Sequence, residues 1–242
     1  FSAWIFALLR NMCSMARFRV TLYRGVVMIR RGLFTQRDIY ISSALPCCPM
    51  MCDTAATMFM KRAPLYLRGE MILPPADKQT ALKMVRALLG SDPRETRYRI
   101  TPPRCALFGH CALPLGWSAG LAAALILVPL MHSAGLLQYV ELLKTTLWCG
   151  MAAFLWTAAV YAAYMFRSGI SVGDIIGISS RRFTRLYTVF SRKDEPVSAE
   201  IIQNPIQKKD GLCDFRLVFH ERVRTRLRQI PSDSVRRFVS GL

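Results

Sequence analysis

The sequence predicts a β-rich protein in which two small β domains flank a pair of membrane-spanning helices. Two runs in the middle of the chain carry no charged residue: Cys105 to Val140, with 36 residues, and Thr145 to Phe166, with 22. On both sides of these runs, apolar and polar residues alternate as in half-buried strands. Similar motifs occur in the same order before and after the two runs, which indicates an internal duplication.

Charge is separated from apolar sequence along the chain. The 242 residues include 33 Lys plus Arg and 15 Asp plus Glu, a net charge of +18, and 52 % are hydrophobic. A disordered polycation is excluded because it would be poor in apolar residues. A disulfide-knot scaffold is excluded because 8 Cys are too few for this length. Residues 1–104 carry +11 and residues 167–242 carry +7, whereas residues 105–166 are neutral.

The uncharged runs predict a transmembrane helical hairpin at residues 113–166. About 20 apolar residues cross a bilayer as a helix, and we expect the spans at Leu115–Leu136 and Thr145–Phe166. Arginines cluster outside the hairpin, whereas its tip has only Glu141 and Lys144. The positive-inside bias therefore predicts cytoplasmic flanks. A buried hairpin of a soluble protein is the alternative, and two uncharged runs of this length argue against it.

The chain begins with a short apolar stretch that ends at Arg10. Its nine residues are too few to span a bilayer, and it lacks the basic start of a signal peptide. We therefore interpret residues 1–10 as the end of a truncated transmembrane helix, in a chain that is the C-terminal piece of a longer protein.

The first β domain is expected at residues 11–92. Alternation from Phe18 to Leu22 begins a β-meander, and the Arg68-Gly69 turn predicts short strands at 63–67 and 70–73. A helix is predicted over Lys78–Leu89 because its apolar residues share one face, with Gly90 as its stop. Residues 93–112 form a basic linker.

The second β domain is expected at residues 167–242 and repeats this plan. Arg181-Arg182-Phe183-Thr184 parallels Arg31-Gly32-Leu33-Phe34-Thr35, and strand-like residues follow both. The segment Ile230-Pro231-Ser232-Asp233 opens a short helix through Phe238.

The order of small β domain, two spans and second β domain resembles the bacterial membrane-flanked pleckstrin-homology-like family. The residues that carry the resemblance are Arg30–Thr35 with Ile39–Ile41, Arg181–Thr184 with Tyr187–Phe190, and the Asn-Pro and Gly-Leu segment Ile201–Leu212. The first copy departs from the pattern at Ala44–Lys61. The resemblance implies two bent β-barrels, each with a C-terminal helix, in a multi-pass protein of the bacterial inner membrane, and it implies no catalytic residues.

The sequence gives only weak signals for a catalytic or metal site. Cys47, Cys48 and Cys52 are the nearest approach to a metal cluster, but structural zinc needs four ligands, usually in two close pairs. The histidines His110, His132 and His220 are far apart in the sequence. No phosphate-binding loop or nucleophile motif is present. We therefore expect no enzyme, no metal and no cofactor.

The candidate binding residues are arginines. Strict alternation in a strand places Arg222, Arg224, Arg226 and Arg228 on one face, and a second group comprises Arg181, Arg182 and Arg185. Four like charges on one face favour a nearby anion. The inner leaflet is an anionic surface, and the predicted spans would hold this domain close to it. A solvated outer face is the alternative. Nucleic acid is not expected because the interleaved residues are aliphatic and offer no surface for base stacking.

These observations predict a non-catalytic scaffold or sensor that binds the anionic inner leaflet, protein partners or a second copy of itself. The alternative is a subunit of an envelope export or resistance system, with the hairpin lining or gating a path.

Overall fold

The structure is a computed structural model that describes residues 5–6, 9, 12–13, 16–23, 26–33, 36–42, 47–93, 95–133, 140–219 and 223–241, without the side chains of residues 130–133. The strands are β1 (Arg19–Tyr23), β2 (Val26–Arg31), β3 (Arg37–Ser42), β4 (Met50–Thr54), β5 (Arg62–Leu67), β6 (Glu70–Asp77), β7 (Thr96–Ile100), β8 (Gly169–Gly173), β9 (Ile175–Arg182), β10 (Arg185–Arg192), β11 (Pro196–Ile202), β12 (Leu212–Phe219) and β13 (Arg224–Pro231). The helices are α2 (Ala55–Phe59), α3 (Lys78–Leu89), α4 (Ala106–Ser133), α5 (Val140–Arg167), α6 (Pro205–Lys209) and α7 (Ser232–Ser240). The expected truncated helix at residues 1–10 lies largely outside the described residues.

The protein is β-rich, as predicted, and its strands form three antiparallel sheets. Two of these are the meander β1-β2-β3 and the sheet β11-β12-β13, and the third has seven strands in the order β6-β5-β4-β10-β9-β8-β7. In the described part of the chain these sheets remain open and close no barrel. The reason is the pairing of β4 with β10, from Arg185↔Thr54 to Val189↔Met50, which joins strands of both β regions in one sheet.

Several local predictions are confirmed. The strands around Arg68-Gly69 are β5 and β6, and the helix over Lys78–Leu89 is α3, which ends at Gly90 with a φ of 81°. Glycine suits this end because it adopts the left-handed conformation without steric cost. The short helix after Ile230 is α7. Residues 93–112, expected as a linker, include strand β7 and the first turns of α4.

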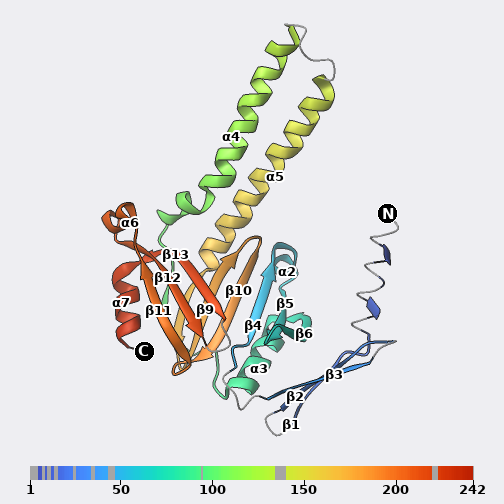
Figure 1. The fold of residues 1–242 in the computed structure, drawn as a ribbon, viewed down its shortest axis with the longest axis vertical. Coiled ribbons are helices and arrows are strands. Elements are labelled where there is room, and N and C mark those ends of the chain that lie inside the picture. Colours follow the sequence, from blue (N-terminus) through green and yellow to red (C-terminus); the bar gives the residue numbers. More distant parts are fainter. Residues whose placement is uncertain are drawn as a thin grey trace.

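Two helices, α4 and α5, are long and apolar enough to cross a membrane. By length and composition the spans are Ala106–Pro129 and Val140–Arg167. In the most apolar 18-residue stretch of each helix, only 22 % and 17 % respectively is buried inside the structure. A core helix of a soluble protein would be mostly buried, so these helices instead present apolar side chains outward. They lie side by side and project away from the sheets (Figure 1). Trp117 and Phe154 stack between them with ring centroids 6.1 Å apart.

Each β region has its own core. In the first, Leu65 and Ile72 are fully buried together with Val85 of α3, and Phe190 of the second region belongs to the same cluster. In the second, Phe215 and Phe238 form an edge-to-face pair with centroids 5.9 Å apart, which holds α7 against the sheet. The two cores meet where β4 pairs with β10.

Candidate functional site

Strand β13 carries three arginines on one face. Arg224, Arg226 and Arg228 are exposed, whereas the residues between them are nearly inaccessible, Thr225 at 4 % and Leu227 at 2 %. Successive side chains of a strand point to opposite faces of its sheet. The alternation predicted for this segment is therefore confirmed over the residues that the structure describes.

A second strand brings two more arginines to the same place. Strand β13 packs against β9, whose last residues are Arg181 and Arg182. Together the two strands line a cavity of about 710 Å³ at the base of the helical hairpin. The helices complete its wall with His110 of α4 and Tyr161 of α5. We call the group Arg181, Arg182, Arg224, Arg226 and Arg228 the arginine face.

The structure does not place the other two predicted arginines in this group. Arg185 lies on β10 and does not line the cavity; its hydrogen bond with Tyr187 raises its pKa. Arg222 lies outside the described residues. The structure thus brings together five of the seven predicted arginines.

Arg181 is the most constrained member of the arginine face. Its Cζ atom lies 3.7 Å from the ring centroid of Tyr161, a cation–π contact between strand β9 and helix α5. Its Nη1 atom is buried and has no hydrogen-bond partner among the described residues. Burial lowers the pKa of Arg181, and the positive charge of Arg228 acts in the same direction. An anion in the cavity would supply both the missing acceptor and the missing countercharge.

The arginine face has little compensating negative charge. Arg226 donates to Asp214 at 2.9 Å, and Asp214 also accepts from Gln207 at 2.8 Å and from the Gln229 backbone N–H at 3.1 Å. Within the described part of the chain, the other four arginines of this face have no carboxylate partner. Four guanidinium groups without a carboxylate partner in the described part of the chain make the binding of an anionic group in this cavity electrostatically favourable.

Sequence reasoning did not assign Tyr161 and His110 to this site. The Nε2 atom of His110 is buried without a hydrogen-bond partner among the described residues. The available signal was the spacing of Tyr161 and Tyr164, which share a face of α5 close to its last residue. The Tyr164 hydroxyl donates to the carbonyl of Thr184, 2.8 Å away, and so ties α5 to the β9–β10 turn.

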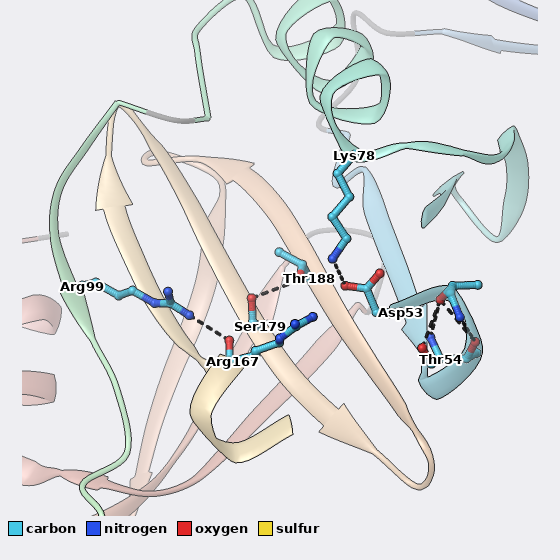
Figure 2. A network of polar contacts seen from close by, with 8 residues as sticks. Asp53, Thr54, Lys78, Arg99, Arg167, Ser179 and Thr188 are labelled. Carbon is cyan, nitrogen blue, oxygen red and sulfur yellow. Dashed lines mark hydrogen bonds and ion pairs between the residues drawn. The ribbon is translucent and has the colours of Figure 1, made fainter. Parts of the chain in front are cut away.

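A polar groove lies on the other face of strand β10. Thr188 lines it, whereas the preceding residue, Tyr187, lines the arginine cavity. Figure 2 shows its contacts: Thr188 bonds Ser179 at 2.9 Å, Lys78 donates to Asp53 at 2.8 Å, and Arg99 donates to the Arg167 carbonyl at 2.8 Å. The first of these bonds connects β9 with β10, the second connects α3 with β4, and the third connects β7 with the end of α5.

The cysteines singled out in the sequence are buried. Cys47, Cys48 and Cys52 are each 3 % exposed, and burial raises the pKa of the Cys52 thiol. Among the described residues, no group of three or more His, Cys, Asp or Glu side chains is placed to hold a metal ion.

Comparison of the chain with protein-family models, with curated proteins and with solved structures found no match.

Proposed function

We propose that this is a non-catalytic membrane-anchored protein whose arginine face binds the anionic phospholipid headgroups of the leaflet that anchors it. In this proposal α4 and α5 cross the bacterial inner membrane, the β regions lie on its cytoplasmic side, and the protein acts as a scaffold or sensor there. The observation that carries the proposal is the set of four arginines without a carboxylate partner among the described residues, around a cavity at the base of the two apolar helices.

The proposed orientation follows from charge. Arg99, Arg104 and Arg167 stand at the sheet-proximal ends of α4 and α5, whereas the distal end of α5 has one acid and one base, Glu141 and Lys144, paired at 2.9 Å. Cytoplasmic segments next to spans carry an excess of Lys and Arg. The excess lies at the end where the sheets begin, which favours a cytoplasmic β region.

We also propose that the two β regions are diverged copies of one pleckstrin-homology-like unit. Their elements follow the same order, three strands and then strand, short helix, two strands and helix. The first series runs β1-β2-β3-β4-α2-β5-β6-α3 and the second runs β8-β9-β10-β11-α6-β12-β13-α7. Duplication accounts for this order more simply than independent origin.

The expected strength of the interaction is moderate. A Lys or Arg close to an anionic membrane surface contributes about 1 kcal/mol. Arg226 is already paired with Asp214, so four arginines contribute on the order of a few kcal/mol before the entropy of ordering their side chains is subtracted. The contribution decreases with salt because exposed charges are screened.

The proposal can be tested by the reactivity of individual arginines. The full chain is reconstituted in nanodiscs of phosphatidylcholine alone or with phosphatidylglycerol, treated with phenylglyoxal, and analysed by mass spectrometry. The full chain is required because β10 pairs with β4 and β8 pairs with β7, so an isolated second region would lose both sheet neighbours. We expect Arg182, Arg224 and Arg228 to react several-fold more slowly in the anionic discs.

The matched controls are Arg86 and Arg237, which are exposed on α3 and α7, away from the cavity. Their reactivity should not depend on the lipid. Equal modification of the arginine face in both kinds of disc, or equal slowing of the control arginines, would contradict headgroup binding by this face.

A further inference from the structure

Three short connecting segments of the β region expose large apolar side chains: the helices α2 and α6 and the turn between β9 and β10. We call these segments the three turns. Outside α4 and α5, the most exposed large hydrophobic residues in the described part of the chain are Phe183 at 80 %, Phe59 at 79 % and Ile206 at 77 %. Phe183 lies in the β9–β10 turn, Phe59 ends α2, and Ile206 lies in α6. Exposure of this extent leaves their apolar surface in contact with water unless something covers it.

All three turns lie at the same edge of the β region. Figure 1 shows α2, α6 and the β9–β10 turn at the edge from which α4 and α5 rise. Direct contacts support this placement for the β9–β10 turn, because the Thr184 carbonyl next to Phe183 accepts the hydrogen bond of Tyr164 on α5, at 2.8 Å.

The other two turns lie close to the helix ends as well (Figure 1). Met58 and Lys61, on either side of Phe59, line the same groove as Arg167, the last residue of α5. On the other side, Gln207 follows Ile206 and bonds Asp214, which also accepts from the Gln229 backbone. The Gln229 side chain lies directly against Gly109 of α4.

Phe183 has an unfavourable backbone conformation in the β9–β10 turn. Two residues, Phe183 and Thr184, separate β9 from β10, and Phe183 has a φ of 53°. Gly, Asn and Asp are the residues that suit a positive φ in such turns, whereas a bulky residue is strained there. Because its ring is 80 % exposed, core packing does not account for a phenylalanine at this position.

Exposed cations lie within three residues of each apolar residue in the sequence. They are Lys61 and Arg62 after Phe59, Arg182 and Arg185 around Phe183, and Lys208 and Lys209 after Ile206. Apolar side chains beside Lys and Arg are the pattern of segments that lie in the interfacial layer of a bilayer.

We propose that Phe59, Phe183 and Ile206 insert into the interfacial layer of the leaflet at which α4 and α5 emerge, so that the β region has three anchoring points besides the helices. This inference rests on the proposed membrane crossing by α4 and α5, but it does not depend on headgroup binding by the arginine face. The three turns lie at the edge of the β region from which α4 and α5 rise (Figure 1). The bilayer that these helices would cross is therefore the apolar phase that covers the three side chains.

The test measures how closely single positions approach the acyl chains. A genetically encoded fluorescent amino acid replaces Phe59, Phe183 or Ile206, one at a time, in the full chain in nanodiscs. The discs contain lipids with a nitroxide quencher high on the acyl chain. The matched control is Val197, which is 58 % exposed at the start of β11, at the opposite end of β10 from the Phe183 turn. We expect at least twofold stronger quenching at the three turns than at position 197.

A second control separates this inference from the membrane crossing itself. Ile126 of α4 is 70 % exposed and should be quenched by a nitroxide near the end of the acyl chain. Quenching at position 126, together with turns no more quenched than position 197, would overturn the insertion of the turns and leave the spans intact. Absence of quenching at position 126 would overturn both the spans and the inference.

Discussion

The attachment of α7 to the sheet that carries the arginine strand allows a quantitative prediction. Phe238 of α7 is 1 % exposed and packs edge-to-face on Phe215 of β12, with centroids 5.9 Å apart. Replacing it, Phe238→Ala, removes a fully buried ring from the core beneath β12 and β13. The substitution should therefore destabilise the strand that holds Arg224, Arg226 and Arg228 without touching those residues.

The size of the effect follows from the burial. Truncation of a buried phenylalanine to alanine costs about 3–5 kcal/mol, which includes the loss of an aromatic pair worth about 0.5–1.5 kcal/mol. Each 1.4 kcal/mol corresponds to about a factor of ten in an equilibrium constant. The protection of the slowest-exchanging β12 and β13 amides should fall by a factor of about 100 to several thousand, because global opening limits their exchange.

Hydrogen exchange of the full chain in nanodiscs, followed by mass spectrometry, measures this change. Val197→Ala is the control, because the same kind of truncation at a 58 % exposed side chain should alter protection by less than about threefold. A loss of protection below tenfold for Phe238→Ala would refute the reasoning, since α7 would then not be part of the core that supports β13.

Three further predictions concern the helix–sheet junction, a buried thiol and the charge balance of the cavity. Gly169→Ala should destabilise the protein by about 1–3 kcal/mol in thermal unfolding. Gly169 has a φ of 150°, and an added Cβ atom would collide with the carbonyl oxygen of Ile100. Gly116→Ala is the control, because a Cβ atom added there meets no atom within 4 Å. Burial raises the pKa of Cys213 from 9.0 to about 11, so alkylation at pH 8.5 should be at least tenfold slower than at the exposed Cys105. The unfolded state releases this proton first, so stability should fall as the pH rises from about 9 to about 11, and a constant stability over that range would contradict the buried thiol. Asp214→Asn should free Arg226 from its only carboxylate partner in the described structure, so that anionic lipid slows the phenylglyoxal reaction of Arg226 as much as that of Arg224; an unchanged difference between the two would contradict the role of Asp214.

Local elements of this protein are readable from the sequence. The helix Lys78–Leu89 ending at Gly90, the helix after Ile230, the two apolar helices and the alternation along β13 were all predicted, and the structure contains them. Each depends on residues close together in the chain, through helical or strand periodicity, a terminating glycine or a minimum apolar length. The same alternation placed Arg224, Arg226 and Arg228 on one face of a strand.

The closure of the sheets and the composition of the cavity were decided only by the tertiary structure. Two separate barrels were expected, but β10 pairs with β4, about 130 residues away in the chain, and the regions share a seven-stranded sheet instead. A strand edge can accept any partner of suitable register, so its choice depends on the packing of both cores. For the same reason the contact of Arg181 with Tyr161 was not predictable, because it requires the end of α5 to meet the end of β9. The sequence determined which segments are helix, strand and basic surface, and the long-range packing determined which of them meet.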